Sequence, residues 1–398
     1  MEGASKPGGA KGKIVVLSVA ASTATTFPVF LTGALAVVIS RHLSISTTMV
    51  GVLVAGFFAA AVPSSAYVGG AVERIGSKMV MRASAIGTAA AELFIVFFAH
   101  GFVTFLGGLV VAGVTNGAMQ PAVNLMLARA IDRRKQGAAF GIKQAAIPVA
   151  TLLSGLAVPL VALTLGWRFA YLGGAVFALV VAVVVRSAAT DSGRPKGGVA
   201  VADFRYTPLI VLALGMALGA GAANSLGAFL VSGAVKAGFS VATAGYLAAY
   251  GSAVGVTTRV VSGYLADRRN GRHFLVVVGM LVGGSLGYLL LSLGTGVVYV
   301  IAVGVAYAAG WGWNGLYNFA VVVNHPDAPA KATGITQAGA YVGSVFGPVL
   351  FSISVDHFGF AFSWQADALV SLLAAATVYV GRSILITELR RREATAGS

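Results

Sequence analysis

Long apolar runs separated by short polar breaks occupy almost the whole chain. Twelve of these runs are long enough to cross a bilayer, because a membrane helix needs about 20 mainly apolar residues. The pattern therefore predicts an all-α membrane protein with twelve transmembrane helices. Their approximate spans are 14–40, 48–71, 78–99, 102–128, 138–164, 168–186, 208–234, 241–265, 273–293, 297–323, 332–356 and 361–385.

Two of the polar breaks resemble each other, which indicates an internal repeat. Gly69 and Gly263 are 194 residues apart, and so are Glu73 and Asp267. A repeat of about half the chain length means two halves built on one plan. With six helices each, the halves would share one orientation and be related by pseudo-two-fold symmetry about the membrane normal. We expect an N-terminal bundle at 1–186, a cytoplasmic linker at 187–206 and a C-terminal bundle at 207–398.

Composition supports a membrane location. Hydrophobic residues make up 58% of the chain and charged residues only 10%, whereas a soluble domain is roughly a quarter charged. The chain has no cysteine, which excludes disulfides and thiolate metal sites. The apolar run that starts at Ile14 is longer than a secretory signal segment, typically ~7–15 residues, so we expect it to be a retained helix.

The basic residues are distributed unevenly between the two sides that the twelve spans define. On the side of the termini lie 22 of the 27 Lys and Arg residues. Cytoplasmic loops carry such an excess, so both termini are predicted to be cytoplasmic in a cell (inner) membrane. The net charge of +15 is then a signal of orientation, and we expect no nucleic-acid partner.

The twelve spans and the repeated loop resemble the major facilitator superfamily of secondary transporters, over roughly Ile14 to Ile386. The family's loop pattern Gly-x-x-x-Asp-Arg-x-Gly-Arg follows helix 2 and helix 8. In the first copy Glu73 replaces the Asp, and Ser77 and Lys78 stand where an Arg is usual. The second copy has one inserted residue. The matching positions are Gly69, Arg74 and Gly76, then Gly263, Asp267, Arg268, Gly271 and Arg272.

These loop residues have two interpretations. Gly69 and Gly263 would let helices approach closely, and Glu73 and Asp267 would bond to Arg or to a helix start. Such contacts could hold a gate shut. Alternatively, the charges only anchor a cytoplasmic loop.

The resemblance implies that helices 1, 4, 7 and 10 line a central cavity. Amide side chains recur on these helices, where lipid would leave them without partners. Alternatively, they form hydrogen bonds between helices. Two further matched amides, Gln144 and Gln337, either flank the cavity or pin helix contacts. The predicted substrate-binding amides and their neighbouring indole are Asn116, Gln120, Asn124, Asn224, Asn314, Asn318 and Trp313.

Two basic residues lie inside predicted spans, where charge is costly and usually functional. Arg259 can bind a carboxylate through two parallel hydrogen bonds, and Lys143 is the second candidate for contact with an anion. Arg259-x-x-x-Gly263 resembles the eighth helix of monocarboxylate and oxalate carriers, although Gly255 occupies the position of an Asp common in the former. The alternatives are a salt bridge or helix-end bond for Arg259 and snorkelling to the surface for Lys143.

Glu92 and Asp367 are the buried acidic candidates for proton coupling, since a buried carboxyl can carry a proton. Each could instead be a local hydrogen-bonded carboxyl, because the family's helices 3 and 12 are peripheral. The His residues have no metal-ligand spacing, and no phosphate-binding loop is present. We expect no enzyme activity, no metal and no cofactor.

These features predict a secondary active transporter, monomeric in the bilayer, that works by alternating access. The preferred cargo is a small organic anion, with proton-coupled symport as an option. One alternative is proton-driven efflux of drugs or of neutral or cationic metabolites. An alternative of another class is a membrane sensor or scaffold that transports nothing.

Overall fold

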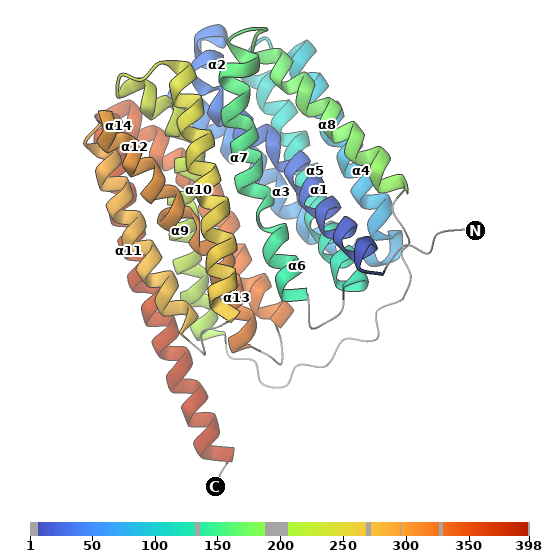
Figure 1. The fold of residues 1–398 in the computed structure, drawn as a ribbon, viewed down its shortest axis with the longest axis vertical. Coiled ribbons are helices and arrows are strands. Elements are labelled where there is room, and N and C mark those ends of the chain that lie inside the picture. The colour runs from blue at the N-terminus through green and yellow to red at the C-terminus, as the bar shows by residue number, and fades with distance from the viewer. Residues whose placement is uncertain are drawn as a thin grey trace. The chain divides into compact units, whose positions relative to one another are not determined.

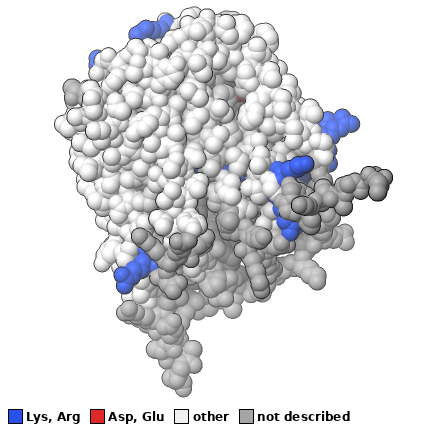
Figure 2. Space-filling model, viewed as in Figure 1, with Lys and Arg blue, Asp and Glu red and all other residues white. Residues whose placement is uncertain are grey.

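The computed structural model describes residues 7–131, 136–187, 206–267, 272–294, 296–325 and 329–396. All regular elements in these ranges are helices (Figure 1). The side chains are mostly uncharged on the face drawn in Figure 2, where the visible Lys and Arg lie near its margins. The all-α prediction is confirmed.

The first six spans come from nine helical segments. Span 1 is interrupted near Leu35, and span 5 is interrupted at Gln144–Ala145 before ending in a π-helical turn. Span 5 therefore consists of α6, α7 and η2. The segments are α1 (Pro7–Ala34), α2 (Ala36–Leu43), α3 (Thr47–Ile75), α4 (Ser77–Phe98), α5 (Phe102–Ala130), α6 (Gln136–Lys143), α7 (Ala146–Ala157), η2 (Val158–Ala162) and α8 (Trp167–Ser187).

The last six spans come from seven segments, because span 10 is divided and the last two are joined. Gly359 interrupts α14 with φ 81° and ψ 172°, a backbone conformation that favours glycine. The segments are α9 (Thr207–Lys236), α10 (Val241–Asp267), α11 (His273–Ser292), α12 (Gly296–Val305), η3 (Ala306–Trp311), α13 (Trp313–Asn324) and α14 (Pro329–Ala396).

The helices account for twelve membrane crossings. Ten stretches of the described chain are long and apolar enough to span a bilayer, with Ala332–Glu388 counted as one. The break at Gly359 divides that stretch in two. The remaining span is α10, whose 27 residues extend about 40 Å at 1.5 Å per residue. The protein is therefore a multi-pass membrane protein.

The chain forms two compact units. Unit 1 comprises Met1–Lys196 and Gly227–Val256, and unit 2 comprises Gly197–Leu226 and Thr257–Ser398. Each of α9 and α10 thus contributes to both units. The linker predicted at 187–206 lies almost wholly outside the described residues, so the division into halves at that point remains a prediction.

Unit 1 is held together by close contacts between helix backbones. Gly113 and Gly117 of α5 lie against the backbones of Phe57 and Ala61 of α3, where a Cβ atom would overlap the carbonyl oxygen. Lipid tails provide no hydrophobic force between helices, so this van der Waals packing of small residues contributes directly to stability. The adjoining core is formed by apolar side chains of α1, α4, α5 and α8.

Unit 1 also contains the second part of α9 and the first part of α10. Gly33 of α1 lies against the backbone of Ala228 on α9, and Gly155 of α7 lies against Gly245 on α10. Ser252 donates a hydrogen bond of 2.8 Å to Thr151 of α7. These contacts join segments about 100 to 200 residues apart in sequence.

Unit 2 uses the same kind of packing between α9 and α14. Gly343 and Gly347 of α14 lie against the backbones of Ala217 and Gly221. We call such a line of glycine contacts between two helices a glycine seam. An aromatic cluster around Trp313 and Tyr317 fills the core beside the seam of α9 and α14.

Candidate functional site

A chain of hydrogen bonds links α1, α5 and α6 in unit 1. The Lys143 ammonium donates to Gln120 Oε1 at 2.5 Å, and Gln120 Nε2 donates to Asn116 Oδ1 at 3.3 Å. Thr25 and Thr26 each donate to the same Asn116 oxygen at 3.1 Å. The structure therefore brings together three residues that the sequence placed in the binding site.

Most of the unused hydrogen-bonding capacity of this cluster lies in N–H donors. Gln120 Oε1 accepts from Lys143, and Asn116 Oδ1 accepts from Gln120 and lies 3.1 Å from two threonine hydroxyls. Each hydroxyl has one proton, which the Ser22 carbonyl of α1 can also accept. Lys143 has three N–H groups and each amide has two. Within the described residues, one N–H of Lys143, one of Gln120 and none of Asn116 are used. No carboxylate in that part of the chain pairs with Lys143, which is 6% exposed.

The break in span 5 places Lys143 in the cluster. Residue 143 is the last of α6, and the backbone turns through Gln144 before α7 begins at Ala146. Gln144 is half-buried in that turn. Asn124 lies one turn beyond Gln120 on α5 but is exposed, and no hydrogen bond joins it to the cluster within the described residues.

Arg259 of unit 2 lies beside the irregular middle of span 10. The π-helical segment η3 ends at Trp311, and α13 begins at Trp313. Arg259 Nη2 donates to the Trp311 carbonyl at 3.0 Å, and Arg259 is 8% exposed. This bond is of the helix-end kind that was the alternative to an anion contact.

The predicted amides of unit 2 form two separate groups. Asn318 Nδ2 donates to Asn314 Oδ1 at 3.3 Å, and Asn318 Oδ1 is buried without a partner among the described residues. Asn224 Nδ2 donates to Ser344 Oγ at 3.0 Å and so connects α9 with α14. Gln337 is half-buried on α14.

Trp313 does not line a site in this structure, contrary to the prediction. Its side chain is 0% exposed and packs against Gly219 of α9. Its indole N–H donates to the Gly310 carbonyl at 2.8 Å. Trp313 is a core residue because its ring fills the space beside a glycine.

The two repeated loops are described only in part. Gly76 ends α3 with φ 95°, and the side chains of Arg74 and Arg272 are exposed. The close helix approach expected at Gly263 is absent from the described chain, because a Cβ there would meet no atom within 4 Å. The surroundings of Gly69, Glu73 and Asp267, and all of Arg268 and Gly271, lie outside the described part of the chain.

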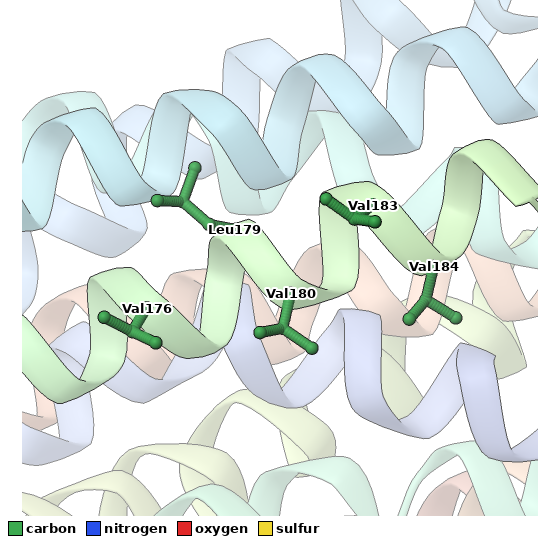
Figure 3. A pocket seen from close by; sticks show the side chains of 5 residues that line it. All are labelled: Val176, Leu179, Val180, Val183 and Val184. Atoms are coloured by element: carbon green, nitrogen blue, oxygen red, sulfur yellow. The ribbon is translucent and has the colours of Figure 1, made fainter.

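A shallow hollow on α8 is distinct from these polar groups. Figure 3 shows the five side chains that line it, all from one helix and all apolar. A surface of this kind suits lipid tails and offers a cargo no polar contact. The residues are Val176, Leu179, Val180, Val183 and Val184.

Comparison with known proteins identifies the family. The family model of the Major Facilitator Superfamily matches residues 15–330. The chain belongs to the major facilitator superfamily. No curated protein matches the chain in sequence.

Solved structures of major facilitator transporters share this fold. One is a bacterial homologue of the human lysosomal transporter Spinster, inward-facing and unoccupied. It has a TM-score of 0.76 and 14% identity over 96% of this chain and 99% of that chain. A second is a D-xylose–proton symporter, with a TM-score of 0.75 and 15% identity over 92% and 96%.

A third is the inward-open xylose transporter of E. coli, with a TM-score of 0.76 and 12% identity over 93% and 95%. At these identities the likeness shows the major facilitator fold alone. Twelve transmembrane helices in two bundles are therefore confirmed, and the family makes the chain a transporter by class.

Several contacts of this major facilitator chain were missed by sequence reasoning. The bond between Arg259 and the Trp311 carbonyl depends on a π-helical turn that no sequence pattern predicts. The hydrogen bond from Asn224 to Ser344 spans 120 residues. Thr25 and Thr26 were visible as hydroxyl residues on helix 1, but their shared acceptor was not.

Proposed function

We propose that this transporter moves a small organic anion by alternating access. The supporting observation is that the Lys143–Gln120–Asn116 cluster contains a buried ammonium and has more spare N–H donors than spare acceptors. An anion, or a cargo rich in oxygen acceptors, would complete these bonds, whereas a cation would meet the ammonium of Lys143. Arg259 is the first candidate for the anion contact and Lys143 the second.

The cost of burying charge supports the same assignment. A cation inside a membrane segment normally pairs with an acid or faces a functional cavity. Lys143 is bonded to a neutral amide instead. A carboxylate cargo would form a charge-assisted hydrogen bond, about 1.5–3 kcal/mol in proteins.

Ligand stabilisation of the purified protein tests the cargo class directly. A ligand that binds the folded state raises its melting temperature. The panel compares lactate, oxalate, phosphate and sulfate with xylose and tetraethylammonium. We expect the carboxylates to raise Tm most. Stabilisation by tetraethylammonium or xylose alone would reject the anion assignment.

Transport by Arg259→Ala tests the first candidate. We expect uptake of the stabilising carboxylate into proteoliposomes to be abolished, because the guanidinium contact is lost. Arg259→Lys keeps the charge but loses the paired geometry, and we expect it to be impaired. Size-exclusion profiles show whether each variant is folded. Normal uptake by folded Arg259→Ala would remove Arg259 from the site.

Orientation and coupling complete the proposal. The excess of Lys and Arg on one side supports cytoplasmic termini in a cell membrane, which accessibility of a C-terminal tag would test. Proton coupling remains an option that comes from the family resemblance. Higher cargo levels in cells that lack the protein would favour efflux, whereas lower uptake there would favour import.

A further inference from the structure

Each unit contains one buried acid with an unpartnered oxygen. Glu92 of α4, in unit 1, is 0% exposed, and both of its carboxyl oxygens lack a hydrogen-bond partner in the described chain. Asp367 of α14, in unit 2, is buried, and its Oδ2 likewise lacks a partner there. Neither acid belongs to the hydrogen-bonded cluster of the proposed cargo site.

In unit 1 the carboxyl of Glu92 fills a gap opposite a glycine. A Cβ at Gly174 of α8 would overlap Glu92 Oε1 and lie 3.0 Å from the ring of Phe27 on α1. Tyr171 lies one turn before Gly174 and close enough to Glu92 for an electrostatic interaction. Its hydroxyl is engaged with Thr32 of α1 at 2.8 Å.

The basic residue of α8 that is nearest in sequence to Gly174 is Arg168, and its hydrogen bonds go to other groups. Arg168 donates to the carbonyls of Val96 and Ala99, at the end of α4, at 3.0 Å and 2.9 Å. The described groups around Glu92 are therefore aromatic rings, hydroxyls and a glycine, with no cation.

In unit 2 the buried acid lies on α14, and its contact is with α11. Asp367 interacts electrostatically with Tyr288 of α11, whose hydroxyl is also buried without a partner among the described residues. The ring of Trp364, one turn before Asp367, stacks on Tyr288 with centroids 6.3 Å apart and planes at 4°. Tyr307 is the other titratable group close to Tyr288.

The third and ninth membrane spans, which are α4 and α11, correspond at a step of 196 residues. Their helical segments begin at Ser77 and His273. A close contact supports the same step: Gly87 meets Thr115 in unit 1, and Gly283 meets Ala309 in unit 2. Glu92 therefore corresponds to Tyr288.

The sixth membrane span, which is α8, and the twelfth, which is the part of α14 after Gly359, correspond at a step of 193 residues. Gly166 and Gly359 precede them, with φ values of 107° and 81°. An aromatic pair four residues apart follows each glycine, Trp167–Tyr171 in the first helix and Phe360–Trp364 in the second. Gly174 therefore corresponds to Asp367.

We propose that each bundle has one proton-binding slot between equivalent helices, filled by a single carboxylic acid that keeps its proton. The slot between α4 and α8 is filled by Glu92 opposite Gly174. The equivalent slot between α11 and α14 has the positions reversed, with Tyr288 opposite Asp367. Either helix can supply the carboxyl, but each slot holds one.

The surroundings favour the protonated form. A carboxylate needs donors or a cation to replace the water it loses on burial, and an acid without them becomes neutral instead. Neither slot provides a cation among its described groups. The proton on Glu92 is resident, because Glu92 has no exposed surface through which water could exchange it. The inference does not depend on the cargo.

Infrared spectroscopy of the purified protein at neutral pH tests the protonation. We expect two carbonyl-stretch bands of protonated carboxyls, one lost in Glu92→Gln and the other in Asp367→Asn. In D2O the Glu92 band should shift slowly. Absence of both bands, or immediate exchange at Glu92, would overturn the proposal. If Glu92→Gln does not fold, the exchange of the wild-type bands still decides the question.

Exchanging the acid between helices tests the equivalence of the slots. Gly174→Asp alone places two carboxyls in one slot, so we expect a clear loss of melting temperature. Adding Glu92→Tyr recreates the unit 2 arrangement and should recover part of that loss. Tyr288→Glu with Asp367→Gly is the reciprocal pair. If the double variants lose at least the sum of the single losses, the two slots are not equivalent.

Discussion

At the residue scale, the carbonyl oxygen of the Asn116 side chain is the shared acceptor of the polar cluster in unit 1. Gln120 donates to the Asn116 oxygen, the hydroxyls of Thr25 and Thr26 lie within hydrogen-bond distance of it, and Lys143 donates to Gln120. The bonds orient both amides so that their carbonyls accept within the cluster and their remaining N–H groups are available. A carboxylate would therefore meet groups that are already oriented, which lowers the entropy cost of binding.

Replacing Lys143 should weaken anion binding while preserving the fold. Lys143→Met keeps the apolar stem and removes the ammonium, which costs about 1.5–3 kcal/mol or roughly ten- to a hundredfold in Kd. Titration calorimetry with the stabilising carboxylate measures this. Lys143→Arg, which retains the charge, is the matched control. Equal affinity in wild type and Lys143→Met would place the cargo elsewhere.

At the element scale, the glycine seams hold helices at distances that no larger residue permits. Gly117→Ala would push a methyl group into the Ala61 carbonyl of α3, whereas Gly173→Ala on α8 would meet no atom within 4 Å. We expect Gly117→Ala to destabilise unit 1 by about 1–3 kcal/mol and Gly173→Ala to be neutral. Thermal unfolding measures both. Equal melting temperatures would contradict this account of the seam.

The corresponding glycine seam in unit 2, between α9 and α14, predicts the outcome of a second pair of substitutions. Gly343→Ala would bring its methyl group against the Ala217 carbonyl on α9, while Gly279→Ala on α11 would have open space around it. We expect a lower folded yield in detergent for Gly343→Ala only, because tight packing replaces the hydrophobic force in lipid. Comparable yields for the two variants would argue against a packing role.

Some features of the helices could be predicted from the sequence, and others could not. Span number and the twofold plan followed from apolar run length and a repeated loop, because lipid demands long helices. The break at Gln144 was not predictable, since an apolar helix can be interrupted with no change in its composition. Trp313 was placed in the binding site because residue type and helix number do not tell which face contacts a neighbouring helix.

At the scale of the whole molecule, Thr151 and Ser252 join α7 of the first repeat to α10 of the second, within unit 1. The alternating access that we propose moves the two repeats against each other, so it requires this contact to open and close. The chain has no cysteine, so Thr151→Cys with Ser252→Cys introduces one defined pair. We expect oxidation to stop uptake and dithiothreitol to restore it. Either single cysteine is the control, and undiminished uptake after complete cross-linking would show that this contact need not open.

The division of α9 and α10 between the units limits how the protein can be produced in pieces. A fragment that stops at residue 196 lacks Gly227–Val256, which complete its unit. Its faces on α1 and α7 would be left uncovered at Gly33 and Gly155. We expect neither fragment of a split gene to accumulate alone, and the two to be recovered together only when co-expressed in one membrane.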